Sequence, residues 1–182
     1  MSATVTPFAR ILVPIDFAAA SEESIKAGES IEVDNQHIEI ADASRRALAV
    51  AAGLARLSSG TLLLVHVTPP LNYNALYTGA ARNVGLSGEM INEVHRAARE
   101  TSLHALKTLA DQVCSDLQVQ VEARPGIALY TILEEAGRFQ ADLIVLAASG
   151  RSRVARFFVG STADRVIREA NCPVLVIPAT RG

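Results

Sequence analysis

Short apolar runs alternate along this chain with longer amphipathic segments. The runs, rich in Val, Ile and Leu and bounded by Gly, Pro or polar residues, predict buried strands. They lie at Arg10–Pro14, Thr61–Val67, Leu143–Ala147 and Val174–Ile177. The amphipathic segments repeat apolar residues every three or four positions, which predicts helices. They lie at Ser44–Leu57, Glu89–Ser115, Leu129–Phe139 and Ser161–Glu169. Ser44 is a possible N-cap residue, and Ser161 or Thr162 lies near the N-cap of the last helix.

One further segment, Leu117–Glu122, alternates apolar and polar residues and predicts a half-buried strand near a sheet edge. Regular alternation of strands and helices indicates an α/β fold: a single doubly wound domain whose parallel sheet is covered by helices on both faces. Such sheets bind ligands outside the carboxyl ends of their strands, where the strand order reverses. The polar stretch at residues 69–88 is expected to be a long loop.

Composition narrows the class of protein. The 182 residues are 49% hydrophobic, which suits one folded domain, and no apolar run is long enough to span a membrane. A net charge of −2 without a basic stripe argues against binding to nucleic acid. The two cysteines, Cys114 and Cys172, do not form a disulfide framework and are expected to be reduced thiols. Because the first residues lack the apolar core of a signal peptide, we expect a cytoplasmic protein.

The charge is unevenly distributed. Residues 21–42 hold seven acidic residues and one basic residue, Lys26. Within this stretch, Ser30–Ile40 alternates apolar and polar positions on both sides of Asp34 and Asn35, which is typical of a β-hairpin. A lone hairpin is marginally stable in water, so this one should pack against the domain or another subunit. The sequence therefore predicts one domain, 1–182, with an acidic hairpin-like insert at about 21–42, after the first strand.

Candidate chemistry follows the strand that ends at Ala147. The stretch from Ser149 to Thr162 combines glycines, arginines and Gly-Ser-Thr at the start of a helix. Glycines that let the backbone approach closely, N–H groups of a helix N-terminus and hydroxyl groups all suit an anion such as phosphate. An ordinary turn with solvated arginines remains an alternative. Asp16, after the first strand, could accept hydrogen bonds from a ribose or merely cap the following segment.

Four segments carry a resemblance to a known family. Ile11–Phe17, Leu64–Val67, Gly150–Thr162 and Asn171–Val176 are similar to the universal stress protein family. The family's nucleotide-binding pattern is Gly, two residues, Gly, nine residues, Gly, then Ser or Thr. Gly150, Gly160 and Ser161 match this spacing, whereas Ala147 stands at the first glycine position.

The resemblance implies a five-stranded parallel sheet of order 3-2-1-4-5 and a site for ATP, or for ADP or AMP, with Mg²⁺ accompanying ATP. Adenine would lie near the first two strand ends, ribose on the acidic residue and phosphates in the glycine loop. The residues carried over are Pro14, Ile15, Asp16, Val67, Ala147, Gly150, Arg151, Gly160, Ser161 and Thr162. It also implies a homodimer, which we expect to form through the C-terminal edge strand, 174–177.

The expected function is that of a stress-response or signalling module acting through nucleotide-linked conformation or an unidentified protein partner. The alternatives are a nucleotide-free dimeric interaction protein or a weak ATPase. No Walker A or zinc-protease motif is present, so no catalytic residue is assigned. We expect His66 to be buried with a partner, Glu134 and Glu135 to form a solvated helix face, and Gly126 to lie at the ligand edge.

Overall fold

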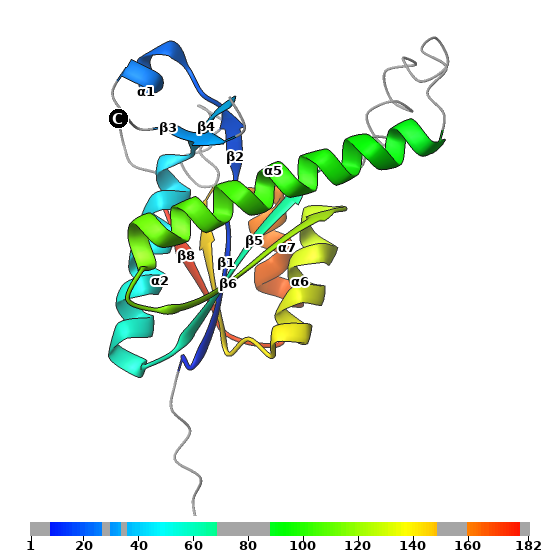
Figure 1. The fold of residues 1–182 in the computed structure, drawn as a ribbon. Coiled ribbons are helices and arrows are strands. Elements are labelled where there is room, and N and C mark those ends of the chain that lie inside the picture. Colours follow the sequence, from blue (N-terminus) through cyan, green and yellow to red (C-terminus); the bar gives the residue numbers. More distant parts are fainter. Residues whose placement is uncertain (1–7, 27–29, 34–35, 69–87, 149–159, 179–182) are drawn as a thin grey trace, which may run out of the picture.

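The computed structural model describes residues 8–26, 30–33, 36–68, 88–148 and 160–178. Its main layer is a five-stranded parallel sheet (Figure 1). The strands are β1 (Arg10–Pro14), β5 (Thr61–Thr68), β6 (Gln118–Pro125), β7 (Leu143–Ala147) and β8 (Val174–Ile177). They lie side by side as β6-β5-β1-β7-β8, which is the order 3-2-1-4-5 when parallel strands are counted along the chain. The predicted fold class and strand order are therefore confirmed.

Helices cover both faces of this sheet, as predicted (Figure 1). On one face lie α2 (Asp42–Ser58) and α5 (Gly88–Cys114); on the other lie α6 (Ala128–Phe139) and α7 (Ser161–Glu169). Side chains of β1 alternate between the two layers: Ile11 and Val13 join the α2 and α5 core, and Leu12 joins the α6 and α7 core. All three are fully buried, which explains the uninterrupted apolar run.

Some predicted boundaries are wrong for reasons of tertiary structure. Helix α2 begins at Asp42, with Ala41 at the N-cap position, so Ser44 is not the cap. Its buried hydroxyl instead accepts a hydrogen bond from the backbone N–H of Asp16 at 3.3 Å. Strand β6 continues to Pro125 because its last residue still pairs with Thr68 of β5. The predicted loop falls largely on residues 69–87, outside the described part.

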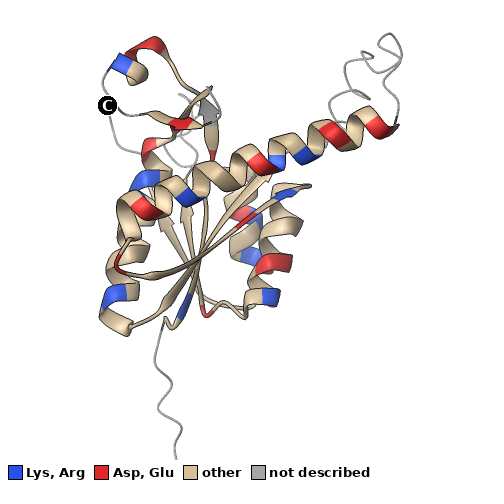
Figure 2. Cartoon of the chain, in the orientation of Figure 1, with Lys and Arg blue, Asp and Glu red and all other residues tan. Residues whose placement is uncertain are grey.

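The insert is a second, antiparallel sheet of order β2-β4-β3. Its elements are β2 (Phe17–Ala19), α1 (Glu22–Lys26), β3 (Ser30–Val33) and β4 (Gln36–Ile40). The predicted hairpin is confirmed, because β3 pairs with β4; β2 and α1 were not predicted. Ile31, Val33 and Ile40 are buried in the same core cluster as α2 and α5. The insert therefore adds a layer to the domain, and Glu22, Glu23 and Glu32, which belong to its described part, are exposed. Figure 2 shows acidic positions along its elements.

Candidate functional site

The strand order reverses between β1 and β7, so ligand-binding residues are expected just beyond these strands. At the end of β1, the N–H of Ile15 donates to the carbonyl oxygen of Val65 at 2.8 Å, and the Ile15 side chain is buried. Asp16 follows and is exposed, while its backbone is held by the hydroxyl of Ser44. Strand β1 thus places the Asp16 carboxylate at the edge of the sheet, on a backbone that hydrogen bonds hold in place.

His66, near the end of β5, holds the backbone next to Asp16 through a hydrogen bond. Its Nδ1–H donates to the carbonyl oxygen of Ile15 at 2.8 Å, and its ring centroid lies 4.4 Å from that of Phe17. Burial lowers the pKa of His66, while the bond to Ile15 and the charge of Asp16 oppose this shift. The prediction of a buried histidine with a partner is confirmed. The ring of His66 contacts both residues that flank Asp16, because it donates to Ile15 and packs against Phe17.

Of the expected adenine-side residues, Ile15 belongs to the α2 and α5 core cluster and Val67 packs on the opposite face of the sheet. Pro14 is half-buried in β1, opposite Val65 of β5. Val67 packs against the α6 and α7 core cluster. Gly126 lies at the expected edge, where its N–H donates to the carbonyl oxygen of Thr68 at 2.9 Å. A Cβ at Gly126 would collide with the hydroxyl of Thr131, so packing within the domain already explains this glycine.

The phosphate-side residues follow β7. Ala147 ends this strand opposite Ile177, and its side chain packs against the α2 and α5 core cluster. Among the described residues, a positive φ is found at three non-glycine positions, and Ala147 is not one of them. A methyl group there meets no backbone strain. Gly150 and Arg151 lie outside the described residues.

Helix α7 presents its N-terminus after this gap. Gly160 is its N-cap residue, with φ 88° and ψ 144°, a conformation that side chains strongly disfavour. Ser161 is exposed and Thr162 half-buried in the first turn. The first N–H groups of a helix have no partner within it, and the helix dipole adds positive potential there. This end can therefore receive an anionic group.

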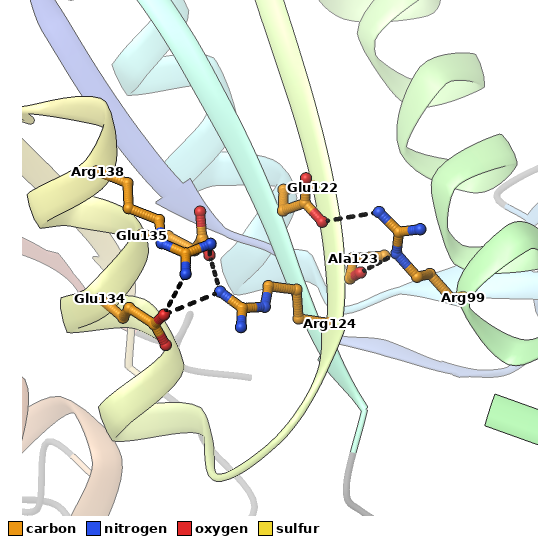
Figure 3. A network of polar contacts seen from close by, with 7 residues as sticks. All are labelled: Arg99, Glu122, Ala123, Arg124, Glu134, Glu135 and Arg138. Atoms are coloured by element: carbon orange, nitrogen blue, oxygen red, sulfur yellow. Dashed lines mark hydrogen bonds and ion pairs between the residues drawn. The ribbon is translucent and has the colours of Figure 1, made fainter. Parts of the chain in front are cut away.

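An ion-pair network outside the expected site corrects one prediction (Figure 3). Glu135 is not solvated: its side chain is 8% exposed and lies between Arg124 and Arg138. Glu134 is about half exposed and pairs with the same two arginines, at 3.3 and 2.6 Å. The network ties α6 to the end of β6, which is a structural role. The adjacent glutamates gave no signal of it, because the arginine at the centre comes from another element.

Three further properties concern the described residues. Cys114 and Cys172 are free thiols, as predicted. Within the ranges described, no group of three or more His, Cys, Asp or Glu side chains could hold a metal ion. None of the described helices is both long and apolar enough to cross a membrane.

The described geometry defines a doubly wound α/β domain with a candidate anion site beside its strand-order reversal. The model of the universal stress protein family matches residues 38–178. A universal stress protein of Thermus aquaticus is 30% identical over 139 residues, which cover 75% of this chain and 90% of that relative. The chain therefore belongs to the universal stress protein family.

Other comparisons agree. The universal stress protein MJ0531 of Methanocaldococcus jannaschii is 34% identical over 91 residues, 50% of this chain and about half (52%) of that relative. The solved structure of UspA from Lactobacillus plantarum is 25% identical, with a TM-score of 0.61, and covers 94% of this chain and 98% of its own. Two solved structures share the fold at lower identity: an Arabidopsis thaliana family protein with AMP bound (16%, TM-score 0.56, 94% and 92% covered) and a universal stress protein in complex with cAMP (19%, TM-score 0.52, 96% and 99% covered).

The family match begins only at Ile38 and so leaves out β1 and Asp16. The structure nevertheless has β1 at the centre of the sheet, paired with both β5 and β7. The acidic insert separates β1 from the rest of the family pattern in the sequence but not in space.

Proposed function

We propose that this chain binds an adenine nucleotide at the carboxyl edge of its parallel sheet and acts as a cytoplasmic stress-response or signalling module. The observation that carries the proposal is the pair of groups on either side of the strand-order reversal. Asp16 follows β1 on one side, and on the other the N-cap residue Gly160 precedes α7, after β7. A carboxylate suits ribose hydroxyls, and a helix N-terminus suits phosphates.

Relatives of the same fold support the adenine nucleotide as the ligand class, because two of their structures hold AMP and cAMP. In this chain, Pro14, Ile15 and Val67 would line the base, and Asp16 would accept hydrogen bonds from the ribose. Gly160, Ser161 and Thr162 would hold phosphate together with Gly150 and Arg151, with Ala147 beside them. The N–H groups and hydroxyls of the first turn of α7 are the donors for this role.

Ala147 bears on the alternative, a nucleotide-free interaction protein of the same fold. Its methyl group packs against the core cluster, and its backbone needs no glycine. Both facts support a site that tolerates alanine at this position. ATP, accompanied by Mg²⁺ held mainly through phosphate oxygens and water, is the expected form. Conformation or partner choice, and not turnover, would then carry the function.

The decisive measurement is mass spectrometry of the small molecules released when purified protein is denatured. It is combined with calorimetric titration of the nucleotide-free chain with ATP, AMP, cAMP and GTP. We expect adenine nucleotides to bind more tightly than GTP, and Asp16→Asn to weaken binding at least tenfold. Asp42→Asn, which changes an exposed acid in the first turn of α2, is the matched control and should bind normally. If the chain neither releases nor binds any nucleotide, the proposal is wrong and the alternative, a nucleotide-free interaction protein, holds.

We also propose a homodimer through the outer edge of β8, where Leu175 is 37% exposed. An apolar edge strand invites pairing with a second copy. Leu175→Lys should shift the mass measured by light scattering toward the monomer. An unchanged mass would exclude this edge as the interface.

A further inference from the structure

The three residues around Asp16, positions 15–17, form a turn that leads from one sheet to the other. Strand β1 ends just before this turn, and the N–H of Ile15 still donates to the carbonyl oxygen of Val65 in β5 at 2.8 Å. Asp16 then leaves the parallel sheet, and Phe17 begins β2 in the insert. The exposed Asp16 carboxylate is therefore carried by a backbone whose two neighbours belong to different sheets.

A side chain of β5 contacts both ends of this turn. The carbonyl oxygen of Ile15 can only accept, so its bond of 2.8 Å with His66 places the proton on Nδ1 of the ring. The same ring packs against Phe17, with 4.4 Å between the ring centroids. His66 is 9% exposed, and burying an imidazole costs free energy that burying an apolar side chain does not. Both contacts of the ring go to the residues that flank Asp16.

Ser44 holds the middle of the turn. Its hydroxyl oxygen accepts from the N–H of Asp16 at 3.3 Å, and Ser44 is buried in the first turn of α2. The two residues are 28 positions apart, and pairing within the insert brings them together, because Phe17 pairs with Ile40 just before α2 begins. The insert thus returns the chain to Asp16, where α2 can hold it.

We propose that His66 and Ser44 are positioning residues for the nucleotide, holding the turn in the conformation in which the Asp16 carboxylate meets a ribose, an inference that rests on the proposed function. A group that is ordered before its ligand arrives binds more tightly, because its conformational entropy is already lost on folding. Ordering such a group only at the moment of binding costs about threefold to tenfold in affinity. Both residues act through the backbone of Asp16, so neither needs to contact the ligand.

The first test compares two buried serines. Ser44→Ala removes the acceptor of the Asp16 N–H from a helix, which alanine favours. Calorimetric titration uses whichever of ATP, AMP and cAMP the parent binds most tightly, and the variant should bind it about threefold to tenfold more weakly. Ser102→Ala is the matched control, because Ser102 is also buried on a helix and its hydroxyl donates to Ala98 of the same helix at 2.7 Å. This control should bind as the parent does.

The second test separates the hydrogen bond of His66 from its packing. His66→Leu fills the space without a donor and should weaken binding by about threefold to tenfold. His66→Asn keeps an N–H donor near the position of Nδ1, because the amide nitrogen is the same number of bonds from Cα, and should recover most of the affinity. A role in packing alone predicts the reverse order, since leucine replaces the apolar contacts of the ring better than asparagine does.

A double-mutant cycle with Asp16→Ala shows whether these effects pass through Asp16. In that background, Ser44→Ala and His66→Leu should each change the affinity by less than about twofold. Losses that add in full to the loss from Asp16→Ala overturn the inference. All titrations are made at a temperature at which circular dichroism shows the variants folded. If the His66 variants do not fold, Ser44→Ala, its control and its cycle give the answer without them.

The outcomes separate this inference from the proposed function. A parent chain that binds no nucleotide overturns both. A parent that binds nucleotide and loses affinity on Asp16→Ala, but not on Ser44→Ala or His66→Leu, keeps the proposed function and overturns the positioning roles. Weaker binding by Ser44→Ala and His66→Leu, recovery by His66→Asn and the loss of both effects without the Asp16 carboxylate support them.

Discussion

Gly160→Ala is the change whose effect follows most directly from the backbone. At φ 88° and ψ 144°, Gly160 occupies a region almost restricted to glycine. Holding an alanine there costs about 1–3 kcal/mol. For a domain of this size each kcal/mol lowers Tm by about 2–4 °C, so we expect a loss of about 4–8 °C for the middle of that range. Since the strained residue precedes the first turn of α7, nucleotide binding should weaken as well.

Differential scanning calorimetry measures this loss, with Gly137→Ala as the matched control. Gly137 lies inside α6, and a Cβ there would meet no atom within 4 Å. The helix should therefore gain about 0.5–1 kcal/mol from the same chemical change. Opposite signs for the two variants support the reasoning. A Gly160→Ala chain as stable as the parent would refute it, because the α7 N-terminus would then not need this conformation.

Three further outcomes follow from the polar contacts. Glu135→Gln should lower the free energy of unfolding by about 1–2 kcal/mol in urea titrations, since a buried acceptor loses its charge, whereas half-exposed Glu134→Gln should change it by less than about 0.5 kcal/mol. The pKa of His66 in the folded chain lies below the ordinary value of 6.5, so the unfolded chain binds the proton more readily. The contribution of His66 to stability should therefore be complete above pH 6.5 and should fall as the pH drops from 6.5 toward the folded pKa. His66→Gln should flatten this fall in acid titrations of the free energy of unfolding. The pKa of Asp116 is held at about 2 by the Arg56 guanidinium, and an NMR titration of Arg56→Gln should return it toward its ordinary value.

The strand pattern was predictable because burial on both faces leaves a strong signal. Ile11–Val13 of β1 and Leu143–Ala147 of β7, at the centre of the sheet, consist of apolar residues at every position. Their order follows from the family resemblance, not from the pattern itself. The hairpin of β3 and β4 was also predictable, since Ile31 and Ile38 face the core while Glu32 and His37 alternate with them.

What the sequence did not predict depends on partners that are distant along the chain. Strand β2 has three residues, Phe17–Ala19, and exists because β4 pairs with it. Ser44 has the right residue type for an N-cap, yet its hydroxyl serves the backbone of Asp16 instead. Glu135 looked like part of a solvated pair because its burial depends on Arg124, from the end of β6. None of these contacts leaves a periodic signal.

The central place of β1 has a consequence for the order in which the chain can fold during synthesis. The strand is made first, but its neighbours in the sheet lie at residues 61–65 and 143–144. Until the second neighbour leaves the ribosome, Ile11–Val13 would form an exposed apolar strand edge, which favours aggregation. Completion of the sheet around the first strand therefore waits for about four fifths of the chain, and the N-terminal strand depends on the C-terminal part for its protection.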